Sequence, residues 1–441
     1  MFRSKFVCLT LVSLLLAVFV SCQVGYSAET LTLDDLPGKF ESLIIESDST
    51  LTIDAGEAGV IEGVLTLQGT ADTAPELKIV NNGDFTIKNT VICNTANLTI
   101  QNNGNLILQD VVFTLNGNAT LTIGNGDTCT IADANIQVYG GAFYFSNAGS
   151  LNAHNWYVKD QFDGTFIANS GDAALSETTF VVNGAYGKIE IFNSGDLQIS
   201  HGVFDVNYGG RVNINTLTGT LTVTDSSMDV SGASHGKQSD VNILAANATW
   251  ESCSLVNNGG KINYLNTGEV SVSNCTIYNS GTNPSTILSS SGPTVFKDVS
   301  LSGSGSTSIT NWDSMTLIDS TYNSSHALTL MNNGKLTAEN WLVKTTASTA
   351  KIVVYIGDNG TITFNVPFIE NVSSSVLSSI GPDGQEFVES SGGTIAVTNK
   401  GSITEQADSN LIYILAIVVA IIVVIVVFLM LRKKLFKSTN S

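Results

Sequence analysis

Cysteine is scarce in this chain of 441 residues, and the few cysteines limit how it can be stabilised. Six are present, of which only Cys93, Cys129, Cys253 and Cys275 lie beyond the first 27 residues. Four cysteines in a body of about 380 residues exclude a disulfide-dense scaffold. The protein must therefore be held together by a large continuous core.

Basic residues are also few. Lysine and arginine total 19 against 38 acidic residues, and Arg211 is the only arginine outside the two ends. Without the six basic residues at the ends, the body of the chain carries a net charge of about −25, which repels nucleic acid and acidic polymers. We therefore expect no nucleic-acid partner. Enzymes that act on anionic sugars usually place an arginine beside the substrate, so the scarcity of arginine also weighs against that activity.

The first residues have the order of a secretory signal. Arg3 and Lys5 precede an uncharged apolar run at 6–20, and small and polar residues follow at 21–28. This order predicts a signal peptide over residues 1–27 with cleavage after Ser27. A lipoprotein signal with lipidated Cys22 is the alternative, although Phe19 stands where such signals usually have leucine.

Residues 411–431 form an uncharged run dominated by Ile, Val and Leu. As a helix this run would span about 31 Å, which matches the apolar thickness of a bilayer. Four basic residues follow within residues 432–441, so the positive-inside rule places this tail in the cytoplasm. We predict a single-pass transmembrane helix at 411–431 in the cell membrane, with an extracellular ectodomain. A buried core helix is the alternative.

Between the two ends the chain repeats a short phrase. An Asn-x-Gly or related turn precedes two apolar residues spaced by two, as in Phe85 and Ile87. Thirteen copies from Gly83 to Gly360 give twelve intervals over 277 residues, or about 23 residues each. A fixed period of this size indicates a solenoid or a propeller.

The content of each repeat predicts strands and corners. Apolar residues spaced by two indicate a strand with one buried face, and no helical pattern occurs between residues 30 and 410. Recurrent Asn or Asp supplies corners that need a left-handed backbone, and stacked Asn side chains can bond their copies in the next coil. The predicted corner residues are Asn89, Asp110, Asp133, Asn155, Asp225, Asn274, Asp298, Asp319 and Asn340.

The coil length, the Asn corners and the strands rich in Thr, Ser and Val resemble the right-handed parallel β-helix family, the pectin-lyase-like fold, over roughly residues 45–400. This resemblance implies an all-β, single-stranded parallel β-helix solenoid. We assign an N-terminal cap to 28–50, the β-helix ectodomain to 51–403 and a juxtamembrane linker to 404–410. Within the ectodomain, regular coils are expected at about 80–365 and less regular ones at 366–403. A β-propeller with about forty residues per blade is the alternative.

The fold hosts lyases, hydrolases, tailspikes, adhesins and archaeal or bacterial surface proteins, so the resemblance does not specify an activity. An archaeal origin is favoured because no wall-sorting motif precedes residue 411 and glycosylation sequons are frequent. Polygalacturonase-like members carry paired Asp, Gly-His-Gly and Arg-Ile-Lys, and pectate lyases carry a calcium-binding Asp cluster with an arginine base. None of these strings is present.

The two Ser-His-Gly histidines, His201 and His235, are interpreted as turn or surface residues because they lack flanking partners. We predict no catalytic residue, cofactor or metal site. The alternative is a membrane-tethered polysaccharide lyase or hydrolase with a divergent site, for which the candidate residues are His201, Asp205, Arg211, Asp225 and Asp229.

The expected function is a structural or adhesive surface rod whose partners are the membrane and envelope glycans or surface proteins. Trp156 and Trp341 follow corner Asn residues, where we expect side chains to face outward. With Tyr157 they are candidate ligand-contact aromatics, so a carbohydrate-binding protein is a further alternative. A lateral loop packed on the rod would explain the same aromatics.

Two kinds of covalent modification are predicted. Cys253 and Cys275 lie 22 residues apart in matching phrases, which predicts a disulfide between neighbouring rungs, or alternatively two stacked buried thiols. Cys93 and Cys129 do not match and are expected to be free. Glycosylation is expected at the sequons of Asn97, Asn118, Asn247, Asn323, Asn359 and Asn371, whereas Asn274 is expected to face inward.

Overall fold

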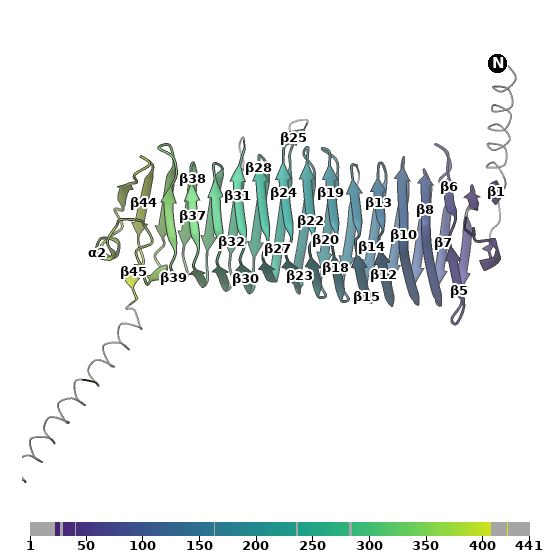
Figure 1. The fold of residues 1–441 in the computed structure, drawn as a ribbon, viewed down its shortest axis with the longest axis horizontal. Helices are drawn as coiled ribbons and strands as arrows, with labels where there is room; N and C mark the ends of the chain where they lie inside the picture. The colour runs from purple at the N-terminus through teal and green to yellow at the C-terminus, as the bar shows by residue number, and fades with distance from the viewer. Residues whose placement is uncertain are drawn as a thin grey trace, which may run out of the picture.

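The chain winds into a column of stacked coils, seen from the side in Figure 1. A computed structural model describes residues 23–26, 30–39, 41–162, 164–234, 237–281, 285–406 and 421. Within these residues, 43 strands join one continuous sheet, and nearly all pairings are parallel and link a strand to its copy one coil later. The protein is therefore an all-β parallel β-helix, as the sequence predicts, and the antiparallel blades of a propeller are excluded.

Each coil contributes three strands, so the column has three faces. Face 1 stacks the strands that lead into the Asn turns: β2 (Thr30–Leu31), β4 (Ser49–Ile53), β7 (Glu76–Asn81), β9 (Asn97–Asn102), β11 (Thr120–Asn125), β14 (Ala142–Asn147), β17 (Thr165–Asn169), β20 (Lys188–Asn193), the first halves of β23 (Arg211–Thr224) and β27 (Asp240–Glu251), β29 (Lys261–Asn266), β32 (Ser285–Ser290), β35 (Ser306–Asn311), β38 (Ala327–Asn332), β41 (Lys351–Ile356) and β44 (Thr394–Asn399).

Face 2 stacks the strands that follow these turns: β5 (Ala58–Ile61), the first halves of β8 (Asp84–Asn94) and β10 (Asn105–Asn116), β12 (Thr128–Ala132), β15 (Ser150–His154), β18 (Ala173–Ser176), β21 (Leu197–Ser200), the second halves of β23 and β27, β30 (Val270–Ser273), β33 (Thr294–Lys297), β36 (Met315–Ile318), β39 (Lys335–Glu339), β42 (Thr361–Phe364) and β45 (Ser402–Glu405).

Face 3 stacks the strands that follow the corners: β1 (Gln23–Tyr26), β3 (Ser42–Ile45), β6 (Val64–Gln68), the second halves of β8 and β10, β13 (Asn135–Val138), β16 (Tyr157–Asp160), β19 (Thr179–Asn183), β22 (Val203–Asn207), β24 (Ser227–Ser231), β28 (Ser254–Asn258), β31 (Thr276–Ser280), β34 (Ser300–Gly303), β37 (Thr321–Ser324) and β40 (Leu342–Thr345).

The corner between faces 2 and 3 has a left-handed backbone. All nine predicted corner residues have φ between 49° and 71°, and Glu177, His201 and Ser252 take the same place in three further coils. Asn and Asp tolerate this conformation better than other side chains, which explains why they recur there. The prediction of left-handed corners is confirmed.

Alternating burial along the strands builds the core. In β11, for example, Leu121, Ile123 and Asn125 are buried while the residues between them are partly exposed. The buried apolar side chains of successive coils stack into one core cluster from Leu31 to Ile403. Each large aliphatic side chain buried in this way contributes roughly 1.5–3 kcal/mol.

A ladder of buried asparagines lines the turn between faces 1 and 2. The Nδ2 of each residue donates to the Oδ1 of the next, at 2.6–2.7 Å. The ladder consists of Asn81, Asn102, Asn125, Asn147, Asn169 and Asn193. The predicted bonding between stacked Asn side chains is thus confirmed. The continuous ladder forms at the Asn-x-Gly turns, and at the left-handed corners Asn155 Nδ2 donates to Asp133 Oδ1 at 2.7 Å and Asn340 Nδ2 donates to Asp319 Oδ1 at 2.8 Å.

Few elements depart from the coil pattern. The helices among the described residues outside the terminal segments are short, η1 (Leu33–Asp35) and α2 (Ser374–Ser378). A hairpin of β25 (Ala233–Ser234) and β26 (Lys237–Gln238) projects from one edge of the column (Figure 1). The strand β43 (Gln385–Val388) pairs antiparallel with β44. The described residues contain no helix that is both long and apolar enough to cross a bilayer. The predicted transmembrane helix lies outside them except for Ile421, as does the predicted signal peptide except for residues 23–26.

Candidate functional site

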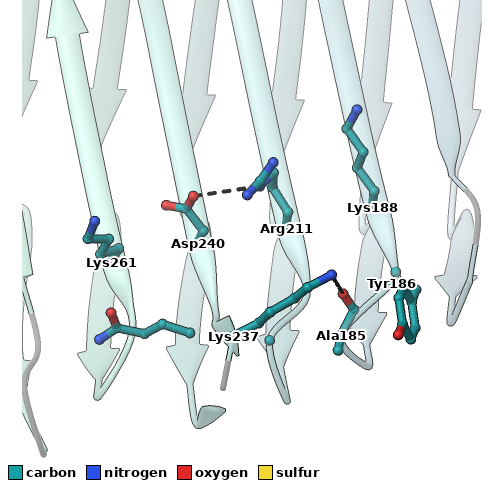
Figure 2. Close-up of a pocket in the computed structure, with 10 residues that line it drawn as sticks. Ala185, Tyr186, Lys188, Arg211, Lys237, Asp240 and Lys261 are labelled. Atoms are coloured by element: carbon teal, nitrogen blue, oxygen red, sulfur yellow. Dashed lines mark hydrogen bonds and ion pairs between the residues drawn. The ribbon is translucent and has the colours of Figure 1, made fainter. Parts of the chain in front are cut away.

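A basic cleft of about 450 Å³ opens on face 1 near the middle of the column (Figure 2). Its floor is formed by the first residues of the four neighbouring strands β20, β23, β27 and β29. Its edge is formed by the turns at 185–187 and at Gly209 and by the projecting hairpin of β25 and β26. The cleft is lined by Ala185, Tyr186, Gly187, Lys188, Gly209, Arg211, Lys237, Gln238, Asp240 and Lys261.

The strand register places the charged floor residues in one row. Lys188 of β20 is the Cα partner of Arg211 of β23, which pairs with Asp240 of β27, which pairs with Lys261 of β29. Neighbouring strands lie about 4.8 Å apart, so the row extends about 14 Å along the column. Residues that are 73 positions apart in sequence thus form one continuous surface.

Two carboxylates balance part of this positive charge. Arg211 Nε lies 3.6 Å from Asp240 Oδ2 (Figure 2). Lys188 Nζ lies 2.5 Å from Glu190 Oε1. The side chain of Arg211 is 55% exposed, so its outer nitrogens are open to solvent. The other oxygen of Asp240, Oδ1, is buried and has no hydrogen-bond partner among the described residues. For Lys261, no described acid lies within ion-pair distance.

The hairpin forms one wall of the cleft and is fixed by hydrogen bonds. Lys237 Nζ donates to the Ala185 carbonyl at 3.2 Å and lies 4.5 Å from the centre of the Tyr186 ring. Gln238 Nε2 donates to the Gly259 carbonyl at 2.7 Å. Gly209 has φ +86°, and a Cβ there would lie 2.9 Å from the Lys237 carbonyl oxygen, so only glycine lets the hairpin approach this closely.

Aromatic and amide side chains extend the cleft surface along face 1. Tyr186 is 64% exposed at the rim. Phe166 stacks on Tyr144 with ring centres 5.2 Å apart, and Lys188 Nζ lies 5.5 Å from the Phe166 centre. An outward ladder runs from Asn263 through Asn242 and Asn213 to Glu190, with bonds of 2.7–3.0 Å.

The candidate catalytic residues do not form one site. Asp205 and Asp229 are neighbours on face 3, where burial and the Asp205 carboxylate raise the pKa of Asp229. His201 and Asp225 are exposed residues of the left-handed corner column, whereas Arg211 lies on face 1 in the basic cleft. The structure therefore joins two of the five residues on one face and separates Arg211 from them. His235 lies outside the described residues.

The expectation that Trp156 and Trp341 face outward is wrong. Their exposed fractions are 0% and 1%, because the left-handed residue before each turns its own side chain outward and directs the next one into the core. Trp156 packs against Phe145 and Phe180, with ring centres 5.7 and 6.0 Å apart. The alternative, a lateral loop packed on the rod, is also wrong for these two residues, because their side chains lie in the core of the column.

Tyr157 lies on the outward side of β16 and is half-buried. Desolvation, Tyr139 and Asp205 together raise its pKa. Of the three aromatics predicted to contact a ligand, it alone remains at the surface.

The predicted disulfide between Cys253 and Cys275 is not formed, and both residues are free buried thiols. They follow the corners Ser252 and Asn274, so they occupy the same inward position in neighbouring rungs. Each thiol donates to the carbonyl two residues earlier, at 3.2 and 3.1 Å, and this bonding stabilises two stacked thiols. The close approach of the two thiols lowers the pKa of Cys253 and raises that of Cys275. The alternative of stacked thiols is therefore correct.

Cys93 and Cys129, the remaining cysteines among the described residues, are free, as expected. Both are buried, and burial raises the pKa of the Cys93 and Cys129 thiols to about 12.

The sequons differ in exposure. Asn118, Asn247, Asn359 and Asn371 are exposed, whereas Asn97 and Asn323 are half-buried within strands. Asn274 is exposed at its corner, so the expectation that it faces inward is wrong. Glycosylation at all six predicted positions stays a prediction.

Arg211 is the one cleft residue that the sequence singles out as a candidate. Lys188, Arg211 and Lys261 each follow a glycine directly and each open a strand of face 1. This recurrence of glycine and a basic residue is a signal that could have identified the row. The contribution of the hairpin could not be found in this way, because its position depends on the three-dimensional packing.

Comparisons of the chain with protein-family models, with curated proteins and with solved structures find no match. The candidate sites therefore depend on the geometry alone.

Proposed function

We propose that this protein is a non-catalytic structural or adhesive rod on the cell surface, with a right-handed β-helix as its extracellular part. The observation that carries the proposal is the uninterrupted stacking of the three faces from β4 to β42, with an apolar core throughout. Parallel stacking pairs the strand backbones in every interior coil, which makes a stiff column suited to holding a surface away from its attachment point.

The sequence at the two ends supports the cell-surface location. The apolar run at 6–20 is typical of a secretory signal, and the run at 411–431 followed by basic residues is typical of a membrane anchor. The described column ends at Gln406, five positions before the second run begins. We propose that the rod stands directly on the cytoplasmic membrane, with its acidic surface in solution and residues 432–441 in the cytoplasm.

Expression of the full-length chain tests this location. The protein should fractionate with membranes, and protease added to intact cells should remove the ectodomain. A chain that stops at residue 405 should appear in the medium. Cytoplasmic accumulation of both chains would contradict the proposal.

Glycan cleavage is the second candidate function, and one observation favours it. Asp205 and Asp229 lie side by side with a raised pKa on Asp229, and paired carboxylates of unequal pKa can act as acid and base on a glycosidic bond. A panel of polysaccharides incubated with the protein should yield no new reducing or unsaturated ends. Cleavage that disappears in Asp229→Ala and persists in Asp72→Ala, an exposed loop variant, would overturn the non-catalytic proposal.

A further inference from the structure

We propose that the basic cleft binds a phosphate monoester carried by a sugar. Such a phosphosugar would be the ligand of the adhesive surface, so the role of this binding in the cell rests on the proposed function. Binding itself can be measured whether or not the protein lies at a cell surface.

Charge in the cleft favours a dianion. Lys188, Arg211, Lys237 and Lys261 meet two carboxylates, those of Glu190 and Asp240, which leaves a formal excess of two positive charges. A phosphate monoester carries about −1.5 to −2 at neutral pH and neutralises this excess, whereas a single carboxylate or sulfate group leaves about half of it. The rest of the molecule is strongly acidic, so an anion is attracted to few other places on it.

The orientation of Arg211 fits an oxyanion with several oxygens. Its Nε faces Asp240, which leaves the outer edge of the guanidinium for a ligand. A guanidinium edge binds phosphate through two parallel hydrogen bonds, and ammonium groups add charge without fixed geometry. Lys188 and Lys261 lie on opposite sides of the pair formed by Arg211 and Asp240, as Figure 2 shows.

Two further observations indicate that the carrier is a sugar. Asp240 Oδ1 is a buried acceptor in the lining that lacks a donor, and a ligand hydroxyl would supply one. Tyr186 presents an exposed ring at the rim, which can stack on the apolar face of a sugar. Inorganic phosphate would use neither group. The carrier should therefore add affinity to that of the anion.

Isothermal titration of the full-length chain in mild detergent tests the proposal with four probes: glucose 6-phosphate, inorganic phosphate, glucuronate and glucose. Glucose 6-phosphate should bind most tightly, with glucuronate about tenfold weaker and glucose undetectable, and its affinity should fall as salt rises. Equal or tighter binding of glucuronate would overturn the choice of phosphate. Equal binding of inorganic phosphate would overturn the choice of a sugar carrier.

Substitutions of cleft residues test whether the ligand binds in the cleft. Arg211→Gln and Lys237→Gln should each weaken glucose 6-phosphate binding about tenfold, while Lys335→Gln, an exposed lysine on face 2, should not change it. Asp240→Ala should still bind inorganic phosphate. It should no longer bind glucose 6-phosphate more tightly than inorganic phosphate. Unchanged binding in both Arg211→Gln and Lys237→Gln, with melting temperatures equal to wild type, would show that the cleft is not the site. Membrane location is measured separately, so a failure here does not depend on it.

Discussion

At the scale of single residues, the ladder asparagines determine how the turns between faces 1 and 2 stack. Asn147 Nδ2 donates to Asn169 Oδ1 at 2.7 Å and to the Gly149 carbonyl at 3.1 Å, and Asn147 Oδ1 accepts from Asn125 at 2.6 Å. These atoms are buried, so water cannot replace a missing partner. Asn147 thus satisfies polar groups in its own coil and in both neighbouring coils.

Asn147→Ala should therefore destabilise the protein by about 2 kcal/mol, because it leaves the buried side-chain oxygen of Asn169 without a donor and removes the 2.6 Å bond that Asn125 Nδ2 donates. Chemical denaturation monitored by circular dichroism measures this change. Asn152→Ala, an exposed position on the next strand, should change stability by less than about 0.5 kcal/mol. Similar effects of the two substitutions would show that the ladder does not stabilise the fold.

Asp229 gives a prediction about pH. Its folded-state pKa is raised by burial and by Asp205, so the folded protein holds the proton more tightly than the unfolded chain does. The resulting stabilisation is present below the usual Asp pKa and is lost as pH rises through the raised value. Asp229→Asn should therefore raise stability by roughly 0.2–1 kcal/mol at pH 7 and have no effect near pH 3.

Melting temperatures across this pH range measure the difference. Asp72→Asn in an exposed loop serves as the control and should show no such pH dependence. An equal rise in melting temperature for Asp229→Asn near pH 3 and at pH 7 would contradict the repulsion between Asp205 and Asp229.

The corner residues show what sequence can and cannot predict at this scale. The left-handed backbone at Asp298 or Asn340 follows from residue type and spacing, because few side chains tolerate that conformation. The burial of Trp341 directly after such a corner does not follow from the alternation of a continuous strand. The corner interrupts that alternation, and only the three-dimensional fold determines on which side it resumes.

At the scale of elements, aromatic residues from neighbouring coils stack inside the column. Phe180 lies between Trp156 at 6.0 Å and Phe204 at 5.1 Å, and Trp341 lies between Tyr322 at 5.9 Å and Phe368 at 5.0 Å. Side-chain packing of Trp156, Phe180 and Phe204 thereby joins three neighbouring coils, in addition to the backbone pairing of β16, β19 and β22. Such stacks add about 0.5–1.5 kcal/mol per pair beyond burial.

Trp156→Ala should cost about 3–5 kcal/mol, because it removes a fully buried side chain and leaves a cavity between Phe145 and Phe180. Thermal unfolding measures the loss. Trp312→Ala is the matched control, since Trp312 is 58% exposed and its removal should be nearly neutral. A small effect at Trp156 would contradict its burial.

The strand pattern was predictable because period-two alternation, the 23-residue period and the turn residues all indicate the same fold. The basic cleft was not predictable to the same degree. Its floor needs a register that aligns Lys188, Arg211, Asp240 and Lys261, and the coils between them differ in length because of the hairpin. A constant period read from the sequence places such residues only approximately.

At the scale of the whole molecule, the protein is a one-dimensional stack in which each coil contacts its neighbours. Stability then depends on the interfaces between coils, and the ends are the weakest points. At the C-terminal end, α2 and the antiparallel strand β43 adjoin the last coils, and Leu377 of α2 is fully buried. These elements protect the edge that would otherwise pair with another chain.

Spin labels on one outward column of face 2 test the stacked column most directly. Cysteines replacing Asn152, Thr222, Thr316 and Thr363 occupy matched positions in the register, three, seven and nine rungs apart from the first. The four cysteines in the described part of the chain are buried, so at these positions the labels should react at the introduced sites. Pulsed dipolar distances from position 152 should rise linearly, to about 14, 34 and 43 Å. Distances that rise and then fall, or that bear no relation to rung number, would contradict the account.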